Sequence, residues 1–319
     1  MDSQHTDLND IGPSALSHLV GQRSVVEQVR VALEAAFADQ RPIDHALLVG
    51  PAGCGKTQTA KVIAAEMASE YHEVLGQALE SPADLNELLL GTKDRDVVLI
   101  DEAALIPNEQ QHALLMALDQ RKIVLAGGKT GRSPQSIPLK NFSLLLATTD
   151  EYKLIAPLID RMRLVLRFQF YSVEDLTEIT RQRCRALNWL IDDDVLPFIA
   201  RRSRGVPRLA LRLVMAARRV ARSEGQTRIT VDDLDRACSL EGIDLLGLGP
   251  TEQQYLRIVA EGTCRLNVIA SRLGLPTRTV ALTEQVLIRL NFLDKDEGGK
   301  RFLTPKAREH LSDSSKDRI

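Results

Sequence analysis

The stretch "GPAGCGKT", which spans Gly50–Thr57, decides the fold class of this 319-residue chain. The apolar run His45–Val49 precedes it and the helix-like stretch Gln58–Met67 follows it, so the motif lies between an expected strand and an expected helix. It satisfies the pattern G-x-x-x-x-G-K-[ST], in which a glycine-rich loop turns its backbone N–H groups toward bound phosphate. The motif therefore predicts a nucleotide-binding α/β domain with a parallel sheet.

Each residue type of this loop has a physical part in holding a nucleotide. The glycines let the backbone approach the phosphates, Lys56 reaches the β and γ oxygens, and Thr57 can ligate magnesium. We therefore expect ATP and Mg²⁺ as cofactors. The ATP-binding residues predicted from this stretch are Gly50, Gly53, Gly55, Lys56, Thr57 and Gln58.

A second motif, "VVLIDEA" at Val97–Ala103, supplies the carboxylates that nucleotide hydrolysis needs. Asp101 at the end of an apolar run can hold magnesium, and Glu102 can polarise the attacking water. Carboxylates at a strand end are also common as helix N-caps. The presence of the phosphate loop about 45 residues earlier favours the catalytic interpretation. We expect Asp101 and Thr57 as metal ligands.

Composition excludes several classes of protein. The net charge is −2 and the sequence pI is near 6.3, so any contact with nucleic acid has to come from local patches. The four cysteines show no C-x-x-C pair, and they are typical of reduced thiols in a cytosolic protein. We found no signal-peptide pattern and no apolar run of membrane-spanning length, which predicts a cytoplasmic protein with no membrane partner.

The chain changes character after Tyr171. Before it, short apolar runs at Ala46–Val49, Val97–Ile100 and Ser143–Ala147 alternate with helical patterns, as in parallel α/β sheets. After it, helical patterns follow one another up to a hairpin-like segment, "FLDKDEGGKRFLT". The order of the last elements is that of a winged helix-turn-helix.

Five segments together resemble the AAA+ ATPases: "GPAGCGKT", "LIDEA", "LLLATTD", "APLIDR" and "SRGVPRLALRL". Their order and spacing most closely resemble the RuvB family of Holliday-junction branch-migration motors, from about Ile11 to Leu311. The resemblance implies a ring ATPase that translocates duplex DNA in recombination and repair. The implied domains are a AAA+ ATPase domain at 1–171 with a β-hairpin inserted at about 123–138, a helical lid domain at 172–247 and a winged-helix DNA-binding domain at 248–319.

The resemblance also implies roles for residues beyond the two motifs. Thr148 matches sensor 1, which responds to the γ-phosphate, and Arg208 matches sensor 2, which touches the phosphates of its own subunit. Arg161 matches the arginine finger, which reaches the ATP of a neighbouring subunit and so implies a ring, in this family a homohexamer. The other implied nucleotide contacts are Ile11, Asp119, Gln120, Arg121 and Tyr171.

The C-terminal segment has only a weak excess of positive charge. From Pro250 to Ile319, twelve Lys and Arg face nine Asp and Glu. The family's wing resembles Arg-Thr-Pro-Arg-Gly-Arg, where this chain has Lys-Asp-Glu-Gly-Gly-Lys. The alternative is an exposed helix and wing with ordinary surface charges. The candidates for contacts with the DNA backbone are Arg278, Arg289, Lys295, Lys300 and Arg301.

The resemblance implies two further partners besides duplex DNA or a Holliday junction. One is a second copy of the chain, and the other is a RuvA-like junction-binding protein that contacts the 123–138 hairpin. Ala126-Gly127-Gly128 replaces bulkier apolar residues in that hairpin, which leaves the identity of this partner open. The chain also departs from the family at Gly12, at Ala103-Ala104 and at Ile159.

Two other functions compete with a DNA motor. A clamp-loader subunit has the same ATPase domain, although it carries a helical collar where this chain has a winged helix. A RuvB paralogue with a regulatory or structural role could bind nucleotide and DNA without turnover. Against it stands the intact set of Lys56, Thr57, Asp101, Glu102, Arg161 and Arg208.

Overall fold

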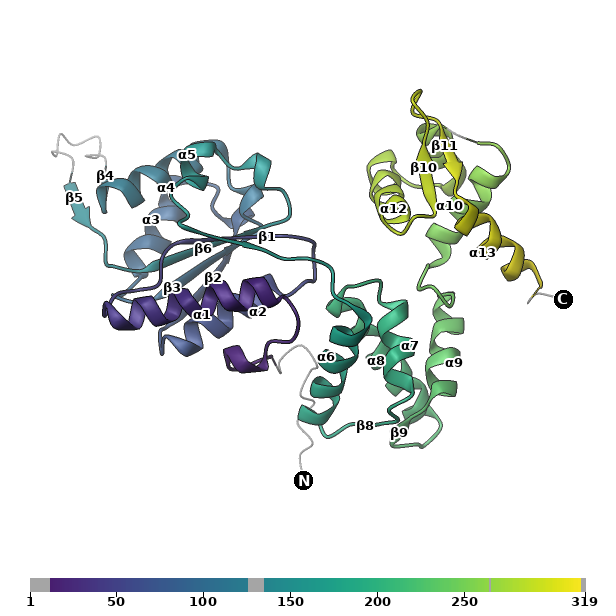
Figure 1. Cartoon of the computed structure of the whole chain (residues 1–319). Helices are drawn as coiled ribbons and strands as arrows, with labels where there is room; N and C mark the ends of the chain where they lie inside the picture. The colour runs from purple at the N-terminus through teal and green to yellow at the C-terminus, as the bar shows by residue number, and fades with distance from the viewer. Residues whose placement is uncertain (1–11, 126–134, 264, 317–319) are drawn as a thin grey trace. The chain divides into compact units, whose positions relative to one another are not determined.

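A parallel β-sheet covered by helices on both faces forms the first part of the molecule (Figure 1). The computed structural model describes residues 12–125, 135–263 and 265–316. The chain divides into two units, of which the first contains residues up to Asn188 together with Gly205–Arg208. The second contains Trp189–Arg204 and the residues from Leu209 onward.

The central sheet has five strands in the order β2-β3-β6-β1-β7, and every neighbouring pair is parallel. Strands β3 and β6 consist mainly of apolar residues because helices cover both of their faces. Parallel strands bring their carboxyl ends to one edge, which is where the phosphate loop begins and where Asp101 lies. The strands are β1 Ala46–Val49, β2 Tyr71–Leu75, β3 Val97–Asp101, β6 Ser143–Thr148 and β7 Leu164–Arg167.

Two apolar cores, one on each face, hold the helices to this sheet. Val29 and Ile63 belong to the core that α1 and α2 form with the sheet, and Leu89 and Leu114 belong to the core under α3 and α4. The helices of this unit are α1 Arg23–Ala38, α2 Lys56–Glu66, α3 Pro82–Gly91, α4 Asn108–Gln120, α5 Ala156–Ile159 and α6 Val173–Ala186.

The predicted β-hairpin is present as an antiparallel pair separate from the central sheet. Strand β4 spans Lys122–Leu125 and strand β5 spans Gln135–Pro138, with Ile123 opposite Ile137. Val124 is exposed. The tip, including Ala126-Gly127-Gly128, lies outside the described residues.

The second unit contains three helices, a short parallel strand pair and a winged helix. The first group is β8 Leu190–Ile191, α7 Val195–Arg202, α8 Pro207–Ser223, β9 Arg228–Ile229 and α9 Val231–Glu241. The winged helix comprises α10 Pro250–Ala260, α11 Leu266–Leu273, α12 Thr277–Arg289, β10 Leu293–Lys295, β11 Arg301–Leu303 and α13 Pro305–Lys316. The predicted fold class is therefore confirmed, including the order of three helices followed by a hairpin.

Side-chain caps begin helices α6 and α9. Ser172 accepts a hydrogen bond from the Asp175 N–H, and Thr230 forms a capping box with Asp233. The connection between α9 and α10 contains the fully buried Leu248. Within the described ranges, no helix has the length and apolarity that crossing a bilayer requires.

Candidate functional site

The phosphate loop has a backbone that requires glycine at Gly50, where φ is +153°. A Cβ there would lie 2.5 Å from the Phe168 carbonyl oxygen, so a side chain would displace the backbone of the segment after β7. Gly53 and Gly55 also have positive φ angles, of +76° and +94°. These conformations leave the backbone of the loop uncovered by side chains and able to approach a ligand closely.

Lys56 is the first residue of α2, and its ammonium group lies inside the loop. The side chain is buried, and Nζ donates to the carbonyl oxygens of Gly50 at 2.7 Å and Pro51 at 3.0 Å. Burial lowers the pKa of Lys56, and the nearby Asp101 carboxylate opposes that shift. The loop thus holds a poorly hydrated cation at the N-terminus of a helix, which favours an anionic ligand.

Asp101, at the end of β3, connects the second motif to the phosphate loop through a hydrogen bond. Its Oδ2 accepts a 2.7 Å hydrogen bond from Thr57 Oγ1, and its Oδ1 accepts one from the Glu102 N–H at 2.9 Å. Hydroxyl and carboxylate oxygens are the ligands that Mg²⁺ prefers, so this donor set fits the metal.

Glu102 has a left-handed backbone, with φ at +52°. A Cβ at Gly76 would lie 2.5 Å from the Glu102 carbonyl oxygen, so the turn that carries this carboxylate requires glycine at that position. The sequence analysis missed Gly76. A glycine beyond the end of β2, the strand beside β3, is the signal that points to a close backbone approach.

Thr148 ends β6 beside the phosphate loop. It lies opposite Val49 of β1, and its carbonyl oxygen accepts a 3.2 Å hydrogen bond from the Gly50 N–H. The side chain is buried, and its Oγ1 accepts from the Asp150 N–H at 2.9 Å. Thr148 therefore lies next to the phosphate loop.

Tyr171 and Arg208 flank the loop. Tyr171 Oη donates to the Cys54 carbonyl oxygen at 3.2 Å, and burial raises the pKa of Tyr171 to about 12. A Cβ at Gly53 would lie 3.0 Å from Arg208 Cβ, and the positive charge of Arg208 is one of the groups that lower the pKa of Lys56.

The remaining predicted nucleotide contacts do not all lie at the phosphate loop. Arg161 forms an ion pair with Asp119 at the end of α4, and its side chain is 53% exposed. Arg121 Nη2 donates to Asn141 Oδ1 at 2.8 Å, and Gln120 is exposed. Asp119, Gln120 and Arg121 are consecutive residues at the C-terminal end of α4. Ile11 lies outside the described residues, and Gln58 reaches Gly12, where a Cβ would lie 2.3 Å from Gln58 Oε1.

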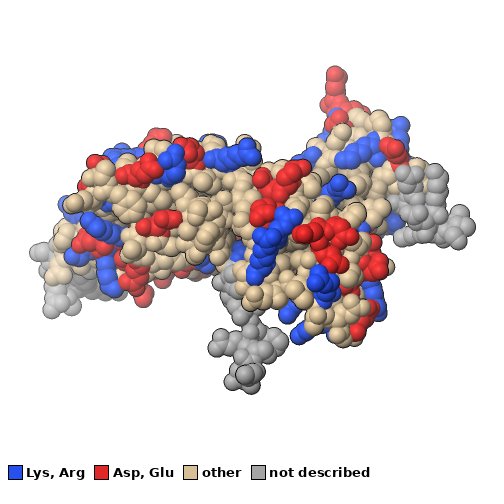
Figure 2. Space-filling model, turned by 60° about the horizontal axis from the view of Figure 1, so that its bottom comes forward, with Lys and Arg blue, Asp and Glu red and all other residues tan. Residues whose placement is uncertain are grey.

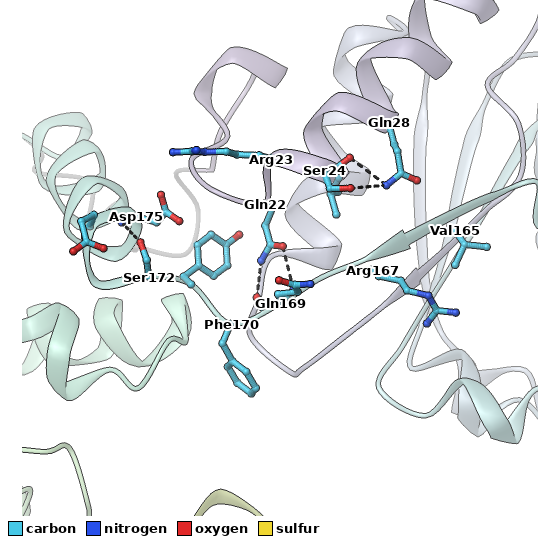
Figure 3. A pocket seen from close by; sticks show the side chains of 13 residues that line it. Gln22, Arg23, Ser24, Gln28, Val165, Arg167, Gln169, Phe170, Ser172 and Asp175 are labelled. Atoms are coloured by element: carbon cyan, nitrogen blue, oxygen red, sulfur yellow. Dashed lines mark hydrogen bonds between the residues drawn. The ribbon is translucent and has the colours of Figure 1, made fainter. Parts of the chain in front are cut away.

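A pocket of about 730 Å³ adjoins Tyr171 (Figure 3). It lies between the start of α1, strand β7 and the start of α6. Gln22 precedes α1 and contacts the segment after β7. Its side chain donates a hydrogen bond to the Gln169 carbonyl oxygen at 2.6 Å and accepts one from the Gln169 N–H at 3.1 Å. Arg23, Arg167 and Asp175 also line it, together with apolar residues such as Val165 and Phe170.

Two of the predicted DNA-contact residues of the wing, Arg301 and Lys295, form ion pairs within the domain. Arg301 Nε and Lys295 Nζ each lie 2.5 Å from an oxygen of Glu284, which is buried in α12. Tyr255 Oη donates to the same carboxylate at 2.7 Å. These contacts hold the pKa of Glu284 near 2, although burial acts in the opposite direction. Arg301 and Lys295 therefore belong to a structural charge cluster.

The remaining DNA-contact candidates are exposed. Arg278 lies in the first turn of α12 and Lys300 at the wing, whereas Arg289 Nη1 donates to the Arg204 carbonyl oxygen at 3.1 Å. Figure 2 shows lysine and arginine interspersed with aspartate and glutamate on the face in view, with no single basic field. This agrees with the weak charge excess of the sequence.

Three family models match the chain in succession. The P-loop domain of the Holliday junction DNA helicase RuvB matches residues 11–168, the RuvB AAA lid domain 171–244, and the RuvB C-terminal winged-helix domain 245–312.

Similar proteins cover nearly the whole chain. The Holliday junction branch migration complex subunit RuvB 2 of Synechococcus sp. is 37% identical over 306 residues, which are 94% of this chain and 82% of that protein. The RuvB subunit of Kosmotoga olearia is 34% identical, with 94% and 89% covered. The structure of the Thermotoga maritima RuvB Holliday junction branch migration motor superposes with a TM-score of 0.80 at 30% identity, covering 94% of this chain and 97% of that one.

Proposed function

The chain belongs to the RuvB family of Holliday junction DNA helicases, and we propose that it is an ATP-driven motor that moves duplex DNA to drive branch migration. This proposal rests mainly on the hydrogen bond between Thr57 and Asp101, which lies beside the buried Lys56. Such an arrangement couples a phosphate cradle to a metal-binding carboxylate.

Lys56 is the residue that we assign to the β and γ phosphates of ATP. In the structure its ammonium group bonds carbonyl oxygens of the loop, and phosphate oxygens are stronger acceptors for the same donors. Gly50, Gly53 and Gly55 leave the backbone N–H groups accessible to these phosphates. We place the base of ATP on the side of Tyr171 and the pocket beside it.

Thr57 and Asp101 are the residues that would hold Mg²⁺, which neutralises developing charge on the phosphates when bound. Glu102 follows Asp101 directly, and we assign it to orienting and polarising the attacking water. Thr148 lies at the end of the strand between β1 and β3, so we assign it to sensing the γ-phosphate. Arg208 lies beside Gly53 and adds positive charge to the phosphates of its own subunit.

Arg161 acts on a neighbouring subunit in this proposal. Its guanidinium lies on the surface and pairs with the partly exposed Asp119, so both groups are accessible to a second copy of the chain. A finger of this kind stabilises transition-state charge only when subunits pack with a nucleotide at each interface. We therefore propose a homohexameric ring.

The winged-helix domain is the part of the chain that we assign to DNA. A RuvA-like protein that docks on the hairpin of β4 and β5 is the partner that we propose for loading the ring at a junction. Exposed Val124 on that hairpin is an apolar group available for such a contact. We propose the cytoplasm as the compartment.

A synthetic four-way junction with homologous arms tests this function. We expect the purified chain, with ATP and Mg²⁺, to convert the junction to duplex products, and Lys56→Ala to leave it intact. Addition of a RuvA homologue should lower the protein concentration required. Conversion that proceeds equally well without ATP would contradict a motor.

A further inference from the structure

We propose that Glu70, His72 and Asp96 bind a Zn²⁺ ion that ties the edge strand β2 to its neighbour β3. One ligand atom from each of these side chains, a nitrogen and two oxygens, lies within 4.8 Å of the other two. Among the described residues, no other three histidine, cysteine, aspartate or glutamate side chains meet in this way. The site is separate from the nucleotide site, so this inference does not depend on the proposed motor function.

The register of β2 and β3 brings the three residues together. Tyr71 lies opposite Val97, and the Val97 N–H donates to the Glu70 carbonyl oxygen at 2.9 Å, so Glu70 and Asp96 lie side by side where the two strands begin. His72 is two residues after Glu70, and alternate residues of a strand point to the same face. A 2.8 Å hydrogen bond from His72 Nε2 to Asp96 Oδ2 shows that these two side chains meet on that face.

The group lies at the opposite end of the sheet from the nucleotide motifs. Asp96 immediately precedes β3, whereas Asp101 is the last residue of the strand. At about 3.3 Å per residue, the strand separates them by about 16 Å. A metal bound by Asp96 therefore shares no ligand with the Mg²⁺ that we assign to Thr57 and Asp101.

Asp96 supplies a fixed and buried carboxylate. The residue is only 4% exposed, and its Oδ2 also accepts the Lys93 N–H at 2.8 Å. Arg95, in the same turn, has φ at +76° and donates its N–H to the Asn141 carbonyl oxygen at 2.7 Å. Within the described parts of the chain, Asp96 Oδ1 has no hydrogen-bond partner. A cation would compensate this buried oxygen, since a desolvated carboxylate is costly unless it is paired or binds a metal.

The donor set fits Zn²⁺ better than Mg²⁺. Imidazole nitrogen and carboxylate oxygen are both zinc ligands, whereas Mg²⁺ prefers oxygen alone. Two carboxylates balance the charge of the ion, and water completes the fourth position. The ion replaces the proton on His72 Nε2, which moves to Nδ1, so the ring stays neutral. His310 and Asp244 form a similar pair at 2.9 Å, but no third ligand of the described chain joins them.

Lys93 is the cation that a bound metal would displace. Its Nζ lies 2.8 Å from Glu70 Oε2, and both side chains are more than half exposed. An exposed ion pair contributes little to stability, so a divalent ion can replace the ammonium group at this carboxylate. The same contact makes Lys93 a competitor for the site, and its removal should strengthen metal binding.

Calorimetric titration of ZnCl₂ into the full chain, free of affinity tags and of nucleotide and with Mg²⁺ in excess, tests the site. We expect one saturable Zn²⁺ per chain. His72→Gln and Glu70→Gln should each lower the affinity at least about tenfold, whereas Lys93→Met should raise it. His112→Gln, which removes an exposed histidine of α4, is the matched control and should bind like the unmodified chain.

Hydrogen exchange tests whether the ion ties β2 to β3. Saturating Zn²⁺ should slow exchange of the β2 amides, because the ion opposes local opening of an edge strand. Glu70→Gln should remove this protection. Glu70 is exposed, so its substitution should leave the melting temperature of the zinc-free chain unchanged.

Two results would overturn the proposal. One is the absence of saturable Zn²⁺ binding, or binding that His72→Gln and Glu70→Gln weaken no more than His112→Gln does, which would identify adsorption to surface histidines. The other is site-specific binding that leaves the exchange of β2 unchanged, which would exclude the connection between the strands. Neither result bears on the proposed motor, whose ligands lie at the other end of the sheet.

Discussion

Thr57 Oγ1 donates a 2.7 Å hydrogen bond to Asp101 Oδ2 and so connects two motifs that are 44 residues apart in the sequence. Thr57 lies in the first turn of α2, and Asp101 is the last residue of β3. The bond places a hydroxyl and a carboxylate oxygen side by side next to Lys56. This pair is the part of the site on which the metal assignment depends.

Thr57→Ala should raise the Mg²⁺ concentration needed for half-maximal ATP hydrolysis by about tenfold or more, because it removes one oxygen of the proposed metal site. Steady-state hydrolysis at fixed ATP and varied Mg²⁺ measures the change. Thr283→Ala, which removes a threonine hydroxyl from α12, is the matched control. An unchanged Mg²⁺ dependence in Thr57→Ala would remove this residue from the metal site.

Lys56→Ala and Glu102→Gln should fail at different steps. The first removes the buried cation of the loop, so we expect it to abolish ATP binding. The second keeps the loop intact, so it should bind ATP and lose at least about a hundredfold in turnover. Equilibrium binding of ATP and release of phosphate distinguish the two. Normal turnover in Glu102→Gln would exclude its action on water.

Arg161→Ala should bind ATP nearly normally and hydrolyse it about a thousandfold more slowly, because its charge completes a neighbour's site. Mixing it with Lys56→Ala should restore part of the activity, since an intact finger then meets an intact loop at some interfaces. Asp119, which pairs with Arg161, should show a smaller effect when replaced by asparagine. Mixed assemblies that remain as inactive as their components would argue against action in trans.

His45 makes the stability of the central sheet sensitive to acid. Burial lowers its pKa from 6.5 to about 4, with Arg121 contributing in the same direction, and Nδ1 accepts the Leu144 N–H. The unfolded chain therefore binds a proton first, and stability falls as pH drops from about 6.5 to about 4. At pH 5 the loss should be on the order of 2 kcal/mol.

His45→Asn keeps an acceptor for the Leu144 N–H and removes the titration. Urea unfolding at pH 7 and pH 5, monitored by hydrogen exchange of the sheet amides, measures the free energy of unfolding. Between these pH values, this free energy should fall less in the variant than in the unmodified chain. An equal loss in both proteins would assign the acid sensitivity to other groups.

Arg301→Met should destabilise the winged helix by about 3 kcal/mol, because it leaves the buried Glu284 with one cation fewer. Calorimetric unfolding of the full chain measures the effect. Lys300→Met, at the adjacent exposed position, should shift the transition by much less. Equal shifts would mean that the Glu284 cluster is not a structural anchor.

The central strands could be predicted from the sequence, and the edge strands could not. Strands β3 and β6 are buried apolar runs, and the two motifs follow recognisable strands. Strand β2, "YHEVL", is only half-buried, and β7 is four residues long with one fully buried position. Edge strands are covered less, so they lack the continuous apolar pattern that identifies their neighbours.

The two sequence motifs that contain Thr57 and Asp101 are local patterns, so the sequence could place them at strand ends, whereas the ion pairs of the wing could not be predicted. Arg301 lies 17 residues from Glu284, and only the packing of the hairpin against α12 shows that these charges meet. The family assignment also excludes the clamp-loader alternative, since the RuvB winged-helix model matches residues 245–312. A regulatory paralogue without turnover is the alternative that experiment has to address.

The most direct test is the rate of ATP hydrolysis by the purified chain with and without four-way-junction DNA. A motor couples the two, so we predict Mg²⁺-dependent turnover that junction DNA raises severalfold and that Glu102→Gln abolishes. Absence of turnover, with ATP bound and junction DNA at saturation, would support the regulatory paralogue. Turnover at the same rate with and without DNA would contradict the coupling on which this account depends.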